Sequence, residues 1–110
     1  MFQDTLQVRR LDGYSVTDLP AFKSEFSSGM DICANFLKSN KKKEIIIPSS
    51  GRKMISTGLA IELPNNCEGQ IRSRSGLAID YGLMVLNSPG TIDQDFRGHL
   101  KIILANFGTE

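Results

Sequence analysis

Polar and apolar residues alternate over short stretches along most of this chain, and no long segment has helical periodicity. The clearest alternation places Leu59, Ile61 and Leu63 on one face of a strand. Other short apolar or alternating runs are separated by Gly, Pro, Asn and Ser and predict further strands. The expected strands are residues 6–11, 30–36, 44–48, 54–64, 82–87 and 99–107. Residues 75–80 are expected to form one helical turn at most.

Many short strands at regular spacing predict an all-β sandwich or barrel. Such a sheet has to close, cover or pair its edge strands. The chain has 110 residues and is 40% hydrophobic, which is enough for one domain with one modest core. We therefore expect residues 1–110 to form a single β domain.

The composition limits the kinds of partner and the cellular compartment that we expect for the protein. Lys and Arg total 13 against 12 acidic residues, so the net charge of +1 argues against a large nucleic-acid-binding surface. Cys33 and Cys67 lack metal-type spacing and are expected to be reduced thiols. The first ten residues have no signal-peptide-like apolar run, and no segment approaches the ~18 apolar residues of a membrane-spanning helix. We expect a cytoplasmic protein with neither a nucleic acid nor a membrane as partner.

Two stretches carry groups suited to phosphate or metal. In "SSGMDICAN", Asp31 comes two residues after a glycine, and a lone aspartate near a glycine is most often a turn former. In "GQIRSRSGLA", Arg72 and Arg74 alternate and can share one face of a strand, close to two serines and Gly76. Guanidinium groups, hydroxyls and an unhindered glycine backbone suit phosphate oxygens. The same residues are also compatible with a polar edge strand.

The stretch "GTIDQDFRG" combines acids, an aromatic ring and an arginine between two glycines. In a regular strand Asp93 and Asp95 would share a face, and Phe96 would point to the other. A carboxylate can act as a general base toward water or help to hold a divalent cation. The alternative is an acidic turn with a core phenylalanine. His99 follows the stretch and has no obvious partner in the sequence.

Together, the three stretches suggest a site for a Mg²⁺-bound polyphosphate, without a Cys or His nucleophile and without a P-loop motif. Their order and spacing resemble the first three motifs of the homotrimeric deoxyuridine triphosphatases (dUTPases): "SGMDICA", "RSRSGLA" and "NSPGTIDQDFRG". The similarity extends over about residues 5–107. It implies a jelly-roll-like β-barrel, a homotrimer with sites at subunit interfaces, and Mg²⁺-dependent hydrolysis of dUTP to dUMP and pyrophosphate.

The resemblance also implies roles for residues of the third motif. Asp93 matches the general base, which must be ionised and within about 3 Å of the attacking water. Phe96 stands where the family usually has tyrosine, the ring that stacks on deoxyribose and excludes a 2′-hydroxyl. If Asp93 and Phe96 act on one substrate, the turn that carries them has to be irregular. Asp95 and Arg97 are expected to be structural and to pair within or between subunits.

Base and phosphate binding are implied for the other matched residues. Asn87 matches the asparagine that hydrogen-bonds uracil, with the hairpin backbone of residues 82–85 completing base recognition. Arg74, Ser75 and Gly76 match the phosphate-binding motif, in which Ser73 replaces a common proline. Asp31 matches the acid that holds Mg²⁺ through water.

The family's fourth and fifth motifs, near the C-terminus, have no counterpart in these residues. We therefore expect a C-terminally truncated dUTPase domain with low or no turnover. One alternative is a catalytically impaired module that binds deoxyuridine nucleotide or a protein partner without turnover. Another is the related dCTP deaminase, which the hairpin and "GTIDQDFRG" fit less well.

Overall fold

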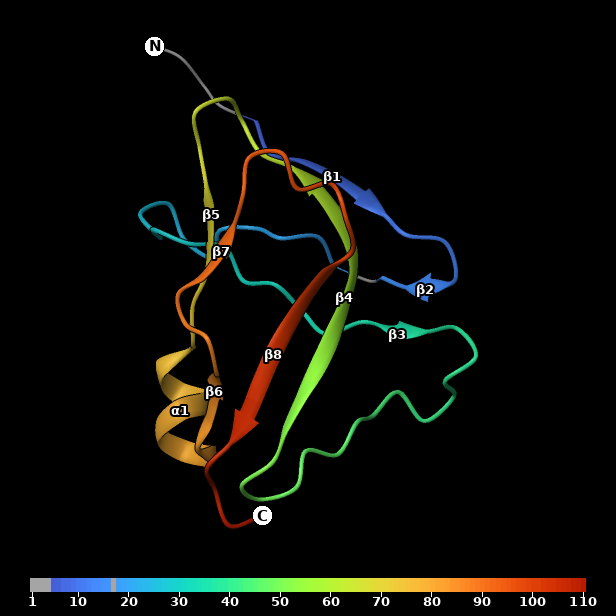
Figure 1. Ribbon diagram of the computed structural model, residues 1–110, viewed down its shortest axis with the longest axis vertical. Coiled ribbons are helices and arrows are strands. Elements are labelled where there is room, and N and C mark those ends of the chain that lie inside the picture. The colour runs from blue at the N-terminus through green and yellow to red at the C-terminus, as the bar shows by residue number, and fades with distance from the viewer. Residues whose placement is uncertain (1–4, 17) are drawn as a thin grey trace.

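Strand β4 (Arg52–Glu62) is the longest element and runs through the main antiparallel sheet, beside β8 (Leu100–Asn106) (Figure 1). The computed structural model describes residues 5–16 and 18–110. The order of the sheet is β1-β4-β8-β6, with β1 spanning Gln7–Arg10 and β6 spanning Leu83–Val85. No helix in these ranges is long and apolar enough to cross a membrane.

Two small strand pairs and one helix complete the fold of the described residues. Strand β2 (Tyr14–Ser15) pairs with β3 (Phe36–Leu37), and β5 (Gly69–Ile71) pairs with β7 (Gly90–Ile92). Helix α1 (Ser75–Tyr81) lies beside β6 (Figure 1). The described chain is therefore mostly β, as the sequence predicts.

The core lies against the second half of β4. Ile61, Ile92 and Leu100 form a buried cluster, and five partly buried side chains pack against it. These five are Leu6, Val8, Ile32, Leu63 and Ile71. Of the three residues predicted to share a face, Leu59 and Ile61 are buried, whereas Leu63 lies beyond the end of β4 and is only partly buried. Ala60, between Leu59 and Ile61, is buried as well. Strict alternation does not hold there because β4 is a central strand covered on both faces.

A bulge interrupts the pairing of β4 with β8. Ser56 faces Lys101 and Leu59 faces Leu100, so Thr57 and Gly58 are extra residues on β4. The Thr57 hydroxyl donates to the Leu100 carbonyl at 2.6 Å and accepts the Leu59 N–H at 3.2 Å. Gly58 has φ +68°, a conformation that favours glycine. These bonds satisfy polar groups that the bulge removes from the ladder.

Several sequence predictions are wrong in detail. Residues 44–48 form no strand, and of the predicted strand 30–36 only Phe36 belongs to a named strand, while Asp31 makes an isolated bridge with Ala21. The β-branched run 44–48 remains outside the sheet because such a run forms a strand only where a partner edge is available. Ile46 in this run is exposed. The segment starting at Ser75 is a seven-residue helix rather than one turn.

Candidate functional site

Asp93 lies directly after the last residue of β7, at the start of an irregular turn. The Phe96 N–H donates to the Asp93 carbonyl at 3.1 Å and closes this turn. The expectation from regular strand geometry, that Phe96 points away from Asp93, is therefore wrong. The turn is irregular, and both side chains line the same hollow.

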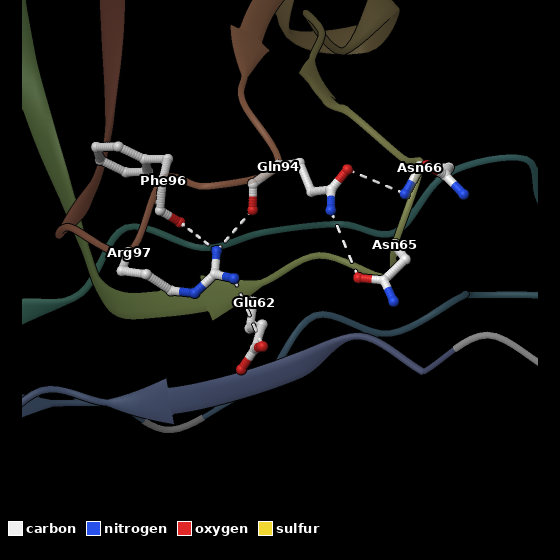
Figure 2. Close-up of polar contacts among 6 residues, drawn as sticks. All are labelled: Glu62, Asn65, Asn66, Gln94, Phe96 and Arg97. Carbon is white, nitrogen blue, oxygen red and sulfur yellow. Dashed lines mark hydrogen bonds and ion pairs between the residues drawn. The ribbon is translucent and has the colours of Figure 1, made fainter.

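Arg97 holds this turn in shape (Figure 2). Its Nη1 donates to the carbonyls of Gln94 at 2.6 Å and Phe96 at 3.2 Å. Its Nη2 lies 3.5 Å from a Glu62 carboxylate oxygen at the end of β4. The structural role expected for Arg97 is confirmed within one subunit, with Glu62 as its acidic partner.

Gln94 ties the same turn to the loop that follows β4 (Figure 2). Its Oε1 accepts the Asn66 N–H at 3.0 Å, and its Nε2 lies 3.5 Å from the Asn65 side-chain oxygen. The amide of Gln94 can make both contacts because it carries a donor and an acceptor. Asp93 and Phe96 are thus presented on a turn that is anchored on two sides.

The hollow in front of this turn has a volume of about 320 Å³. It brings together three of the predicted residues, Asn87, Asp93 and Phe96, over a largely aliphatic wall. That wall includes Ile71, Val85, Ile92, Ile102 and Ile103. Phe96 is 41% exposed, so part of the ring remains available to a ligand. An apolar hollow with a few convergent polar groups is typical of a small-molecule site.

His99 also lines this hollow, and it has partners that the sequence does not reveal. Its Nε2 lies 2.6 Å from the Ser56 hydroxyl, and its ring meets Tyr14 edge to face at 5.0 Å. Burial, and to a lesser degree the charge of Lys101, lower the pKa of His99 below 6.5. The sequence shows no partner for His99 because Ser56 lies on a strand 43 residues away in the chain.

A second hollow, of about 390 Å³, contains the other charged candidates. Asp31 lies there between two cations, with Lys23 Nζ at 3.0 Å and Arg74 Nε at 3.6 Å. The hydrogen bond from Lys23 is the main cause that lowers the pKa of Asp31, burial opposes it, and the charges of Lys23 and Arg74 add to the lowering. Arg72 lines the same hollow, although β5 ends before it.

The remaining candidates lie at the start of α1. Ser75 and Gly76 are its first residues, and they line neither hollow. Arg74 precedes them in an extended conformation and caps the helix without a side-chain bond. The Ser73 hydroxyl accepts the Val85 N–H at 2.9 Å, a contact that a proline side chain cannot make. The structure therefore groups the candidates into two sets: Asn87, Asp93 and Phe96 in one hollow, and Asp31 with Arg74 in the other.

Comparison with known proteins identifies the family of this chain. The dUTPase family model matches residues 16–110. The chain belongs to the dUTPase family.

Curated relatives of this dUTPase-family chain are named deoxyuridine 5′-triphosphate nucleotidohydrolase, which is a hydrolase. The protein from Thermoanaerobacter sp. strain X514 is 48% identical over 105 residues, covering 96% of this chain and 68% of the relative. The protein from Anaplasma marginale strain St. Maries is 43% identical over 103 residues, with 94% and 66% covered. The resemblance read from the three sequence motifs is confirmed.

Solved structures of phage dUTPases have the same fold. A mutant dUTPase from phage phi11 of Staphylococcus aureus, which coordinates a structural Mg(II) ion, matches with a TM-score of 0.76 at 27% identity over 94% of this chain and 61% of that one. A Staphylococcus bacteriophage 80alpha dUTPase with dUpNHpp matches with a TM-score of 0.76 at 26% identity, covering 94% and 54%. The chain thus spans about two thirds of the curated relatives and less of the phage enzymes.

Proposed function

We propose that the protein hydrolyses dUTP to dUMP and pyrophosphate, and so limits uracil incorporation into DNA. The observation that carries this proposal is the shared hollow of Asn87, Asp93 and Phe96. It offers an amide for a base edge, a ring face for a sugar and a carboxylate for a water molecule. The family membership and the names of the relatives support the same activity.

Each residue of this hollow has one proposed task. Asn87 binds the uracil edge, helped by the backbone of residues 82–85, and the Phe96 ring stacks on deoxyribose. Asp93 is the catalytic base that orients the water attacking the α-phosphorus and takes its proton. The anchored turn supports this role, because general-base catalysis depends on a fixed distance between base and water.

The triphosphate is proposed to bind Arg74 of the second hollow together with the start of α1. Arg74 donates to phosphate oxygens, while Ser75 and Gly76 offer a hydroxyl and an unhindered backbone. Asp31 fits a role toward Mg²⁺ through water, since its lowered pKa favours a carboxylate that accepts hydrogen bonds from metal-bound water. One protein carboxylate suits Mg²⁺ that is held mainly by substrate phosphates and water. When bound, the ion would neutralise charge that develops on the phosphates.

We also propose that the protein is a homotrimer with its sites at subunit interfaces. Asp93 and Arg74 line different hollows of one chain, and in this assembly dUTP would contact Asp93 of one copy and Arg74 of another. The enzyme is proposed to act in the cytoplasm, without a nucleic acid or membrane partner. Free Cys33 and Cys67 support a reducing compartment.

The deciding experiment is Mg²⁺-dependent pyrophosphate release from dUTP by the wild type and by Asp93→Asn. We expect release from dUTP at the low rate that the sequence predicts, and much slower release from UTP, dCTP and dTTP. Asp93→Asn should lose about 100-fold or more because the amide cannot take a proton. Asp12→Asn is the matched control, since Asp12 lies in an exposed turn after β1.

Calorimetry with dUpNHpp gives the second reading of the same proteins. Binding by both the wild type and Asp93→Asn, together with release only by the wild type, would support the role of Asp93. Neither binding nor release by the wild type would contradict the proposed function. Equal release from UTP would contradict the proposed recognition of the sugar.

A further inference from the structure

The ring of Phe96 lies against Gly98, two residues further along the same turn. A Cβ atom built on Gly98 would be 2.9 Å from Phe96 Cζ, 3.1 Å from Cε1 and 3.7 Å from Cε2. The first distance is shorter than a real Cβ contact, so any side chain at position 98 would displace the ring. The φ of Gly98 is not in the left-handed region, so the need for glycine comes from space and not from backbone conformation.

The residues on both sides of Gly98 are anchored, so the ring is the part that would yield. Before it, Arg97 binds the Phe96 carbonyl and pairs with Glu62. After it, His99 is hydrogen-bonded to Ser56 of β4. The Phe96 ring, by contrast, is partly exposed at the hollow and has room to move into it.

We propose that Gly98 is a specificity-determining position of this protein. Its missing side chain leaves space for the Phe96 ring to lie close to the backbone of the turn, where the ring admits deoxyribose and excludes a 2′-hydroxyl. This inference rests on the proposed function, in which Phe96 meets the sugar. Steric exclusion of one hydroxyl depends on ring position at the scale of a fraction of an ångström to one ångström. The displacement that a methyl group would cause at position 98 is of that size, and a misplacement of about 1 Å can cost up to 100-fold in rate.

The test compares Gly98→Ala with Gly29→Ala, the matched control, because a Cβ at Gly29 meets no atom within 4 Å. We expect Gly98→Ala to weaken dUpNHpp binding and to lower the ratio of kcat/KM for dUTP over UTP by about tenfold or more. Gly29→Ala should match the wild type in both. Circular dichroism and urea unfolding establish that the variants are folded. An unchanged dUTP/UTP ratio in folded Gly98→Ala would overturn the inference.

A double-mutant cycle separates an effect through the ring from a general effect on the turn. If Gly98 acts through Phe96, Gly98→Ala should have little further effect in a Phe96→Leu background, where the smaller side chain leaves room for the methyl group. Additive losses would mean that Gly98 acts by another route and would overturn the inference. The double variant also relieves the clash, so it remains informative if Gly98→Ala folds poorly.

Failure of the proposed function and failure of the role of Gly98 would give different results. If the wild type neither binds dUpNHpp nor hydrolyses dUTP, the proposed function fails and the selectivity role of Gly98 fails with it. If the wild type discriminates dUTP from UTP and Gly98→Ala does so equally well, only the role of Gly98 is overturned. NMR adds a readout without nucleotide: the Phe96 ring should shift the Gly98 Hα resonances, and Phe96→Leu should abolish that shift.

Discussion

Among the single residues, His99 joins the turn that carries Asp93 and Phe96 to strand β4. The Ser56 hydroxyl lies 2.6 Å from His99 Nε2 and accepts the Gly58 N–H at 3.0 Å. Because the pKa of His99 is lowered, the neutral ring prevails at pH 7 and Nε2 can accept the Ser56 hydroxyl proton. Protonation of the ring would remove that acceptor and place a second positive charge near Lys101.

This gives a stability prediction for the acid side of neutrality. The folded pKa of His99 lies below its ordinary value of 6.5, so the unfolded chain binds the proton more readily. The free energy of unfolding should therefore fall as the pH drops from about 6.5 toward the folded pKa. Urea unfolding between pH 5 and 8 should show this fall in the wild type and less of it in His99→Gln.

Two features allow the pH dependence of stability to be attributed to His99. His99 is the only histidine of the chain, so no other side chain with an ordinary pKa near 6.5 contributes. The pKa of Asp31 is lowered from 3.8, so its contribution is lost only in more acidic solution. Equal pH dependence in the wild type and His99→Gln would contradict the prediction.

At the scale of elements, the bulge in β4 connects the core to the site. Before the bulge, Ser56 faces Lys101 and holds His99 beside the first hollow. Within it, the fully buried Thr57 bonds to β8 and its carbonyl accepts the Asn35 side-chain amide at 2.9 Å. The two extra residues thus set the register of β8, the strand that follows the turn carrying Asp93 and Phe96.

Thr57→Val tests what the buried hydroxyl contributes to the fold. Valine keeps the shape of threonine but leaves the Leu100 carbonyl and the Leu59 N–H without their bonds to the hydroxyl. We expect a loss of about 1–3 kcal/mol in the free energy of unfolding, measured with urea. Thr91→Val in β7 is the matched control, because this exposed threonine should change stability by about 0.5 kcal/mol or less. Equal losses in the two variants would refute a specific role for the Thr57 hydroxyl.

At the scale of the whole molecule, the two hollows are adjacent but distinct. They share Ile71, Val85 and Ile102 as lining residues, while Asp93 lines only one and Arg74 only the other. In the proposed trimer, a nucleotide between two copies would contact both sets of residues. A closed ring of identical copies repeats that contact at every interface.

Mixed trimers test this arrangement. Asp93→Asn and Arg74→Ala should each be inactive alone, yet refolding them together should restore hydrolysis to about a quarter of the wild-type level, since one interface in four then combines an intact Asp93 with an intact Arg74. Light scattering should give three times the 12.1 kDa of one chain. Trimers of mixed composition without restored activity would show that one chain supplies both residues.

Local pattern was sufficient for the mostly β fold and for the shared face of Leu59 and Ile61, because strand alternation acts between residues close together in the chain. The resemblance of the three motifs was sufficient for the family. The same resemblance predicted that Asn87, Asp93 and Phe96 serve one site, and the structure places all three around one hollow, although regular strand geometry had placed Phe96 on the opposite face. The roles of the three residues remain to be tested.

Sequence by itself thus determined the extended segments of β1, β4, β6 and β8 and the chemical groups that the motifs carry. Only the tertiary structure decided that residues 44–48 lack a partner edge, that the turn after β7 is irregular, and that His99 meets Ser56. It also decided that Arg74 faces Asp31 in a separate hollow. The physical reason is that strand pairing, buried hydrogen bonds and hollows depend on segments far apart in sequence, whose approach no local pattern encodes.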